Sequence, residues 1–420
     1  MQHKIDPQKH GPRGEAMANA VQSCVHCGFC LAACPTYSVL GEEMDSPRGR
    51  IYLMKNVLEG NLEAEEAQPY IDRCLGCMGC VPACPSGVPY GDLLTSYRAK
   101  QEAERSRPLI DSVARHMIVE TLPYPGRFRA AAKMGKLGQL IQGSLPEQIG
   151  AMLNLLPEDI PPAVHLPEII PAKGEKRARV AFLTGCVQTV LAPNINQATV
   201  DLLSANGVEV IIPPKQGCCG SILSHIGEDH RAMALARNNL KVFDQIQGEI
   251  DAIITNAAGC GSGMHEYGLL FKGQPEEKAA EAFANKVKDV TVFLDELGLT
   301  SISKKQPARK VAYHDACHLA YAQGVTDPPR NLLNAIPKLT LLELDDGGLC
   351  CGSAGTYNLE QPEIAAQLGQ RKAQAIIDTG ADIVVMGNIG CFTQVENHLS
   401  NLGKKIPVMH TVQLLAEAFK

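Results

Sequence analysis

Residues 179–186 read "RVAFLTGC", and 131 residues later the chain reads "KVAYHDAC", which ends at Cys317. Two further stretches recur in the same order. "GCCGS" at residues 217–221 returns as "LCCGS", and "DAIITNAAGC", ending at Cys260, returns as "DIVVMGNIGC", ending at Cys391. The offsets are 131, 132 and 131 residues. Self-similarity at a nearly constant spacing indicates a duplicated domain.

Each copy alternates short aliphatic runs, such as residues 180–183 and 253–255, with helical stretches such as "EDHRAMALARNNLKVFDQI". This order predicts βαβ units with parallel strands, whose ligands gather at the carboxyl ends of the strands. The cysteines follow strand-like runs, so we expect four thiols to converge in each copy: Cys186, Cys218, Cys219 and Cys260 in the first, and Cys317, Cys350, Cys351 and Cys391 in the second. The main asymmetry is a charged stretch at residues 272–288, which predicts an inserted helix in the first copy.

The adjacent cysteines leave two interpretations open. A disulfide between sequence neighbours is strained and geometry disfavours it, whereas bridging a metal cluster uses both thiols. Further cluster sites in the two copies are one interpretation, and a vestigial thiol-lined scaffold or docking surface is the other. His314 and His318 flank Cys317, and His225 follows the first pair. These histidines either ligate metal or lower the pKa of the thiols, or they have surface and capping roles.

Eight further cysteines lie near the N-terminus, in "CVHCGFCLAACP" at residues 24–35 and "CLGCMGCVPACP" at residues 74–85. Both stretches have the spacing C-x2-C-x2-C-x3-C-P, which is typical of bacterial ferredoxins with two 4Fe-4S clusters. In that arrangement the fourth cysteine ligates the other cluster, so Cys34 and Cys84 should cross over. A pair of zinc sites is the alternative, but three closely spaced thiolates with a distant fourth, doubled, fit zinc poorly.

The order of these segments predicts four parts. A helical connector around residues 92–142 leads into a proline-rich stretch at residues 144–171, which indicates a boundary or an extended linker. The predicted fold is therefore a multidomain α+β and α/β chain: an α-helical two-cluster ferredoxin domain, then two duplicated βαβ-type domains. We place the parts at 1–100 (ferredoxin domain), 101–178 (helical connector and linker), 179–305 (repeat 1) and 306–420 (repeat 2).

Composition excludes several classes of function. The chain has 420 residues, 16 cysteines and a net charge of -6, which provides no basic field for nucleic acid. It has no apolar run long enough to cross a bilayer, and its first residues are polar. We therefore expect a cytoplasmic chain, either free or peripheral on the inner face of the cell membrane. In a reducing compartment so many cysteines indicate metal rather than disulfides.

No nucleotide or flavin site is recognisable in the sequence. There is no P-loop, and the nearest run to G-x-G-x-x-G, "GCGSGM" at residues 259–264, ends in methionine. We therefore expect no flavin or nucleotide on this chain. Because clusters carry single electrons, a two-cluster module suits a relay between a two-electron flavin partner and a quinone or another carrier.

The sequence as a whole resembles the iron-sulfur subunits of bacterial glycolate oxidases. The resemblance covers nearly the whole chain and rests on "CVHCGFCLAACPTY", "SPRGRIYLMKNVLEG", "DRCLGCMGCVPACPSGVPY", "GCCG", "ARNNL", "CCGSAGTYNL" and "NIGC". The duplicated half also resembles the cysteine-rich CCG domains of heterodisulfide reductases, which hold a noncubane 4Fe-4S cluster. That family closes its motif with C-x-x-C, whereas this chain reads "CGSG" from Cys260 and "CFTQ" from Cys391, so both copies lack a fifth cysteine.

The resemblance implies a complex in which FAD-binding dehydrogenase subunits oxidise glycolate to glyoxylate and this chain passes the electrons toward the respiratory chain. It also implies the ligand sets: Cys24, Cys27, Cys30 and Cys84 for one 4Fe-4S cluster, and Cys34, Cys74, Cys77 and Cys80 for the other. Similar chains serve lactate utilisation and anaerobic glycerol-3-phosphate dehydrogenase, so the iron-sulfur subunit of a lactate or glycerol-3-phosphate dehydrogenase is an alternative to that of a glycolate oxidase.

Two other classes of function remain as alternatives to an electron-transfer subunit. The first is a thiol-disulfide or quinone reductase that works at a CCG site. The second is a zinc-bound assembly scaffold.

Overall fold

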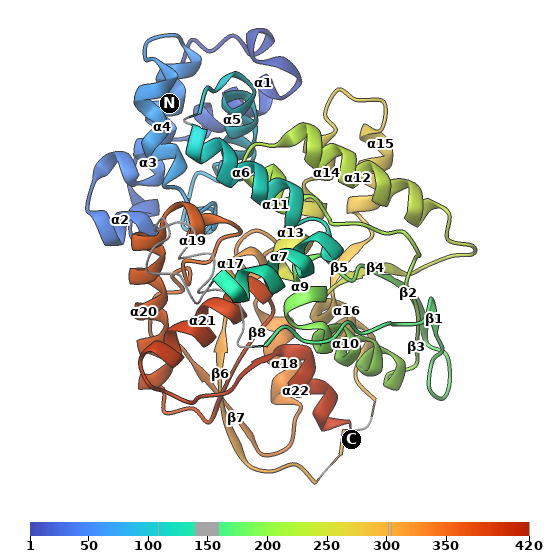
Figure 1. Ribbon diagram of the computed structural model, residues 1–420. Helices are drawn as coiled ribbons and strands as arrows, with labels where there is room; N and C mark the ends of the chain where they lie inside the picture. The colour runs from blue at the N-terminus through green and yellow to red at the C-terminus, as the bar shows by residue number, and fades with distance from the viewer. Residues whose placement is uncertain (108, 139–158, 301, 304, 420) are drawn as a thin grey trace.

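The computed structural model describes residues 1–107, 109–138, 159–300, 302–303 and 305–419. A helical N-terminal region is followed by two sheets of mainly parallel strands with helices around them (Figure 1). This confirms the predicted fold class. None of the helices in these ranges is long and apolar enough to cross a membrane.

The N-terminal region is built from short helices that frame the two cysteine-rich loops. Ser46 caps one of these helices by accepting a hydrogen bond from the backbone N–H of Gly49, and Pro47 occupies the first helical position. The apolar stripe of that helix is buried against its neighbours. The α-helices are α1 (Gly14–Ser23), α2 (Pro35–Leu40), α3 (Pro47–Leu58), α4 (Ala64–Asp72) and α5 (Tyr90–Glu104), with 3-10 turns at Pro7–Arg13, Phe29–Leu31 and Glu43–Asp45.

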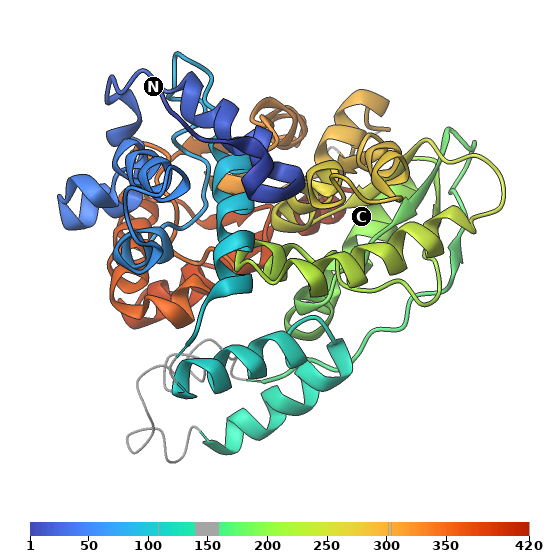
Figure 2. The ribbon, with the colours of Figure 1, turned by 90° about the horizontal axis from the view of Figure 1, so that it is seen from above.

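The predicted connector forms two helices, α6 (Leu109–Thr121) and α7 (Pro125–Gly138), which lie side by side along one flank of the molecule (Figure 2). Part of the predicted proline-rich linker, with Pro146 and Pro157, lies outside the described residues. The end of the linker forms a short strand, β1 (Ile169–Ile170), which pairs antiparallel with β3 of the first sheet. The sequence pattern did not predict this edge strand.

Repeat 1 forms a five-stranded sheet in the order β1-β3-β2-β4-β5. Its strand β4, which lies between β2 and β5, is buried at every position, as expected for a parallel strand covered on both faces. The charged stretch at residues 272–288 forms a helix, as predicted, but it also enters strand β5. The elements are β2 (Ala178–Phe182), α9 (Val187–Leu191), α10 (Pro193–Ala205), β3 (Val208–Ile211), α11 (Ser221–His225), α12 (Asp229–Asp244), β4 (Ala252–Thr255), α13 (Ala258–His265), α14 (Tyr267–Leu270), α15 (Glu277–Ala284), β5 (Val287–Asp289) and α16 (Val290–Leu297).

Repeat 2 forms a parallel sheet in the order β7-β6-β8-β9, which matches the order β3-β2-β4-β5 of repeat 1. Its central strand β8 is likewise buried at every position. The elements are β6 (Arg309–His314), α17 (Cys317–Ala320), α18 (Asp327–Asn334), β7 (Leu339–Glu343), α19 (Tyr357–Glu360), α20 (Pro362–Asp378), β8 (Ile383–Met386), α21 (Ile389–Asn401), β9 (Val408–His410) and α22 (Thr411–Ala418).

The two repeats share one hydrophobic core. Helix α10 of repeat 1 packs on α22 of repeat 2, and α18 of repeat 2 packs on α16 of repeat 1, so equivalent helices exchange partners as in a two-fold arrangement. The carboxyl ends of the central strands also meet: the backbone N–H of Ala258 donates to Gly387 O at 3.1 Å, and Gly259 N–H donates to Asn388 Oδ1 at 3.3 Å. Both thiol groups therefore face the same region.

Candidate metal centres

The eight N-terminal cysteines gather around two small adjoining cavities. One is lined by Cys24, Cys27, Cys30 and Cys84, and the other by Cys34, Cys74, Cys77 and Cys80. The structure thus brings the fourth cysteine of each loop to the other loop. Cys80 also lines the first cavity, so the two sites are neighbours.

The two cysteine loops have left-handed backbone at the same positions, although different residue types occupy those positions. Cys24 to Cys27 and Cys74 to Cys77 enclose His26 and Gly76, which have φ values of 62° and 65°. Two positions later Gly28 and Met78 have φ values of 88° and 60°. Left-handed backbone at His26 and Met78 costs of the order of 1 kcal/mol or more each, and such outliers cluster at ligand-binding sites. The conformation therefore belongs to the loop rather than to glycine.

The donor sets fit two 4Fe-4S clusters. All eight thiols are free, and within either quartet no three sulfur atoms lie within 4.8 Å of one another. Thiolates that share one zinc ion are only about 3.8 Å apart, given a Zn–S distance of about 2.3 Å in a tetrahedron. The quartets are therefore too open for a single ion, and they leave room for a cluster in which each cysteine binds a different iron.

Buried positive charge faces the second quartet. Arg50 has a side chain that is only 1% exposed; its guanidinium donates to Thr36 Oγ1 at 2.9 Å, and Cys34 Sγ lies 3.8 Å away. Burial raises the pKa of the Cys74 thiol, but the charges of Arg50 and Arg98, together with hydrogen bonds from Tyr90 and Gly76, outweigh burial and lower it. Such a site favours a thiolate. The neighbouring Arg48 instead pairs with Glu43 at 2.6 Å.

Repeat 1 assembles its four predicted thiols at the carboxyl ends of its strands. Cys186 follows β2, the adjacent pair follows β3, and Cys260 lies in α13 just after β4. The Sγ atoms of Cys186 and Cys218 are 3.2 Å apart. Gly220 follows the pair with a φ of 86°, and a Cβ there would meet Ala232 O at 3.0 Å, so the turn requires glycine.

Repeat 2 repeats this construction with its own four thiols. Cys317 begins α17 after β6, Cys350 and Cys351 follow β7, and Cys391 lies in α21 just after β8. The Sγ atoms of Cys317 and Cys350 are 3.9 Å apart. In both repeats the strand-end cysteines thus lie at the same edge of their sheet.

The second cysteine of each pair is the one that favours the thiolate form. Hydrogen bonds from Cys218 and Cys260 lower the pKa of Cys219 well below its usual range, and hydrogen bonds from Cys350 and Cys391 do the same for Cys351. The pKa values of the donating thiols are raised in turn. In each repeat the central sulfur of three is thus the one whose pKa its neighbours lower.

The contacts of the two repeats with the ferredoxin region differ. Leu75 and Cys77 of the second cysteine loop pack in one apolar cluster with Cys317 and Cys350 of repeat 2. Burial and, next, the neighbouring thiol of Cys317 raise the pKa of Cys77. Repeat 1 makes no such thiol contact in the part of the chain that the structure describes. The second quartet therefore adjoins the thiols of repeat 2.

Two buried histidines strengthen this junction. His318 Nε2 lies 3.1 Å from Gly76 O in the second cysteine loop, and its Nδ1 lies 2.7 Å from Ser262 Oγ of repeat 1. The ring of His225 meets His318 edge-on, with ring centroids 4.9 Å apart. Burial lowers the pKa of both imidazoles, so they are neutral near pH 7. They hold the parts together rather than lie at the surface.

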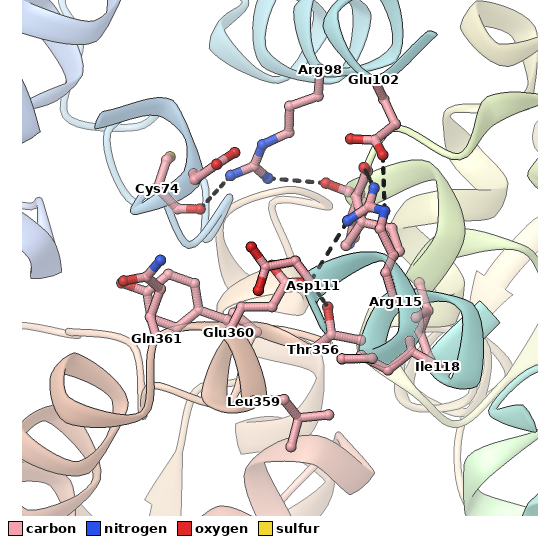
Figure 3. Close-up of a pocket in the computed structure, with 18 of the residues that line it drawn as sticks. Cys74, Arg98, Glu102, Asp111, Arg115, Ile118, Thr356, Leu359, Glu360 and Gln361 are labelled. Carbon is pink, nitrogen blue, oxygen red and sulfur yellow. Dashed lines mark hydrogen bonds and ion pairs between the residues drawn. The ribbon is translucent and has the colours of Figure 1, made fainter. Parts of the chain in front are cut away.

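Arginines close the remaining side of the junction, in a polar cavity of about 270 Å³. Figure 3 shows Arg98 reaching the backbone of the second cysteine loop, where it donates to Cys74 O at 2.6 Å, while its other nitrogen donates to His225 O at 3.0 Å. Arg115 lies between Glu102, at 3.0 Å, and Glu360, at 3.8 Å. Arg98 and Arg115 thus connect the ferredoxin region, the connector and both repeats through hydrogen bonds and ion pairs.

A second, mainly apolar cavity of about 280 Å³ lies between the repeats. Thiols from both repeats line it, together with Leu122, just after α6, and Phe128 of α7. Sequence analysis did not predict this cavity because it needs the two repeats and the connector helices in one place.

Comparison with known proteins supports the assignment of these parts. Residues 20–88 match the 4Fe-4S dicluster domain, and residues 180–265 and 311–396 each match the cysteine-rich domain family that carries the CCG motif. The glycolate oxidase iron-sulfur subunit of Escherichia coli is 36% identical over 412 residues, which covers 95% of this chain and 94% of that protein. This chain belongs to the glycolate oxidase iron-sulfur subunit family. It therefore carries iron-sulfur clusters as a subunit of an oxidoreductase complex.

Other relatives share the iron-sulfur architecture under different names. The probable glycolate oxidase iron-sulfur subunit of Bacillus subtilis is 36% identical over 94% of this chain and 93% of its own length. Lactate utilization protein A of an Exiguobacterium strain is 32% identical over 57% of this chain and 98% of that protein. A fumarate reductase (CoM/CoB) subunit of Methanothermobacter marburgensis is 27% identical over 98% of this chain and 75% of that protein. The family thus extends across complexes with different substrates.

Proposed function

We propose that this member of the family is the electron-transfer subunit of a flavin-dependent 2-hydroxy acid dehydrogenase whose substrate is glycolate. Glycolate would be oxidised to glyoxylate on a partner FAD subunit, and the electrons would leave through this chain to a quinone or another respiratory acceptor. Two full-length relatives at 36% identity carry the glycolate oxidase name, which supports this substrate over lactate. A peripheral position on the inner face of the membrane would bring the chain to a lipid-soluble acceptor.

The observation that carries the proposal is that the thiol sites adjoin one another, from the first quartet to the second and from the second to repeat 2. Cys80 lines the cavities of both N-terminal quartets, and Cys77 packs with Cys317 and Cys350 of repeat 2. A 4Fe-4S cluster, when bound, supplies a one-electron carrier. Neighbouring carriers without intervening solvent suit stepwise transfer from a two-electron flavin.

The protein residues around the quartets have defined roles in this proposal. We assign Cys24, Cys27, Cys30 and Cys84 to one cluster, and Cys34, Cys74, Cys77 and Cys80 to the other. Arg50 and Arg98 stabilise the thiolate charge of the second quartet, and the packing of repeat 2 on its loop excludes water. Both effects act on the reduction potential of a bound cluster.

The experiment uses the native complex with its flavin subunits. Cys77→Ser should abolish glycolate-dependent reduction of a quinone analogue while a dye that takes electrons directly from the flavin subunit is still reduced. Ser23→Ala, which changes an exposed hydroxyl that bonds Asn19 O, serves as the control and should leave both rates unchanged. Oxidation of glycolate by this chain without any flavin subunit would contradict the proposal, and faster turnover of lactate would contradict the substrate.

The cavity between the repeats favours a second candidate function. A small electron acceptor could bind there and be reduced next to the thiols, as a thiol-disulfide or quinone reductase requires. The double variant Cys219→Ser, Cys351→Ser tests this candidate, because it removes the central sulfur of each repeat. Unchanged activity of the complex would reject it.

A further inference from the structure

The first cysteine loop exposes large apolar side chains beside its thiols. Val25 and Phe29 are 66% and 68% exposed, and Phe29 is the most exposed large hydrophobic side chain in the part of the chain that the structure describes. Tyr52 of α3 is exposed as well, and its ring centroid lies 6.1 Å from that of His26 in the loop. Cys27 lines the same small cavity as Val25 and Phe29 and is the only one of the 16 cysteines, all of them described, that is exposed. We call Val25, Phe29 and Tyr52 the outer rim of the first quartet.

The second cysteine loop shows an equivalent position covered by protein. Cys24 of the first loop corresponds to Cys74 of the second, so Val25 corresponds to Leu75. Leu75 is only 7% exposed, because it packs in the apolar cluster that also holds two thiols of repeat 2. An apolar side chain at this position of the loop is therefore an interface residue in the loop that has a neighbour.

A further position of the loops differs in the same way. Phe29 corresponds to Gly79, and a Cβ built on Gly79 would lie 3.6 Å from the ring of Tyr321 in repeat 2 and 3.1 Å from Ala33 O. Repeat 2 thus approaches the second loop so closely that little room remains for a larger side chain. The first loop has a phenylalanine here, which no described element covers. The loop without a neighbour in this chain has the larger exposed apolar surface, which indicates a contact with another molecule.

The chemistry around the outer rim favours a protein over a lipid surface or a small molecule. Arg48 is the only lysine, arginine, aspartate or glutamate that lines the first cavity, and it pairs with Glu43 at 2.6 Å. Interface cores between proteins are likewise depleted in charge and enriched in aromatic residues, whereas docking on an anionic lipid surface uses clustered lysines or arginines. The cavity itself is only about 30 Å³, which is too small for an organic electron carrier.

We propose that the outer rim is the docking surface for the flavin-binding dehydrogenase subunit, which covers the first quartet as repeat 2 covers the second. The inference rests on the proposed function, because that function names a flavin subunit as the electron donor. Electrons then enter at the first quartet and move inward to the second. In each transfer the reduced flavin loses one electron and the iron held by the first quartet gains it, while the protons of the flavin are released on the partner subunit.

Photo-crosslinking in the native complex tests which molecule covers the rim. With benzoylphenylalanine in place of Phe29, irradiation should link this chain to the flavin subunit. The same replacement at Ile169, which is 58% exposed on β1, serves as the control and should give no such link. A link from position 29 to a second copy of this chain or to a different protein, or no link at all, would overturn the proposal.

Affinity measurements on variants separate docking from the integrity of the loop. Phe29→Ser should weaken binding of the flavin subunit roughly 30-fold, as expected when a central aromatic anchor is lost. Ile169→Ser should leave the affinity unchanged. Iron, acid-labile sulfide and the EPR spectrum of the reduced variant chain should match the wild type, which shows that the first site is intact. If Phe29→Ser loses iron, Tyr52→Ser gives the same readout from α3, outside the loop.

The outcomes distinguish this inference from the proposed function. Wild-type affinity in an outer-rim variant with intact clusters would reject the docking surface, whatever the substrate of the complex. A complex that prefers lactate to glycolate but still shows the link from position 29 would contradict the proposed substrate and support the docking surface.

Discussion

The two repeats share the order of four parallel strands and the same four cysteines, yet within the described residues only one of them adjoins the ferredoxin region through its thiols. Repeat 2 packs Cys317 and Cys350 against the second cysteine loop and places His314 among its thiols. Repeat 1 has Leu183 at the equivalent position and meets the ferredoxin region through helices, for example α11 against α5. Duplication therefore preserved the scaffold while its two sites acquired different neighbours.

The difference shows that a cysteine motif determines the positions of the thiols in the fold but not their function. In each repeat hydrogen bonds from two neighbouring thiols lower the pKa of the central sulfur. What distinguishes the repeats is the ring of residues around that sulfur, and those residues come from other elements. Four changes would break or sharpen the comparison.

The largest effect should come from losing a ligand of the second cluster. Cys80→Ser should remove about four irons per chain and abolish electron transfer to the quinone analogue. Because the second cysteine loop packs on repeat 2, hydrogen exchange should rise around residues 350–359 more than around residues 217–225. Equal exchange in both stretches would show that the repeats do not differ in their coupling to the loop.

Giving repeat 1 the imidazole of repeat 2 tests how far the surroundings of the two sites differ. Leu183→His places a polar ring in a fully buried apolar site, so the protein should lose about 3 kcal/mol of unfolding free energy. Thermal unfolding measures this effect. An unchanged unfolding free energy would mean that repeat 1 accommodates the ring as repeat 2 does.

Acidification should have opposite effects on the stability that two equivalent helix-capping residues contribute. Asp289 caps α16 of repeat 1, and His410 caps α22 of repeat 2. Burial raises the pKa of Asp289 to about 6 and lowers the pKa of His410 to about 4. The folded chain therefore holds a proton on Asp289 more tightly than the unfolded chain does, and a proton on His410 less tightly.

The signs of the two stability effects follow from these pKa values. Stability linked to Asp289 is present at low pH and is lost as the pH rises to about 6. Stability linked to His410 is present above about pH 6.5 and is lost as the pH falls to about 4, by roughly 3 kcal/mol. Relative to the wild type, His410→Gln should reduce the loss of melting temperature between pH 7 and pH 4.5, and Asp289→Asn should increase it. Parallel pH profiles for the two variants would refute this assignment.

The smallest effect should come from removing one tyrosine hydroxyl in each repeat, where the hydroxyl donates a hydrogen bond to a backbone carbonyl oxygen. Tyr357 of repeat 2 donates to Arg73 O beside the second cysteine loop at 3.0 Å, and Tyr267 of repeat 1 donates to Cys219 O at 2.7 Å. Replacing either by phenylalanine should lower the unfolding free energy by about 1 kcal/mol, because one buried hydrogen bond is lost. Only Tyr357→Phe should alter the EPR spectrum of the reduced second cluster. A change in both variants would place repeat 1 on the electron path as well.

Local sequence patterns were sufficient to predict much of the molecule. Apolar runs before Cys260 and Cys391 predicted buried parallel strands, and the structure has β4 and β8 there. The crossing of Cys34 and Cys84 followed from ferredoxin spacing and agrees with the placement of their side chains. The edge strand β1 was missed because two isoleucines near the end of a proline-rich stretch have no periodicity to read.

The histidines show where such patterns stop. His314 and His318 lie three residues before and one residue after Cys317, and nothing in the sequence separates their roles. In the structure His314 ends a strand among the thiols, whereas His318 lies on the following helix and contacts Gly76 O and Ser262 Oγ. Two histidines four residues apart therefore have entirely different neighbours.

The sequence by itself determined the ferredoxin loops, the duplication and the strand-end positions of the thiols, because each depends on spacing along the chain and on hydrophobic period. Only the tertiary structure decided which repeat meets the second quartet, which histidine faces the thiols, and that both repeats open on one cavity. These are contacts between residues far apart in the sequence, such as Gly76 and His318, which are 242 positions apart. Packing of whole domains sets them, and no local pattern encodes that packing.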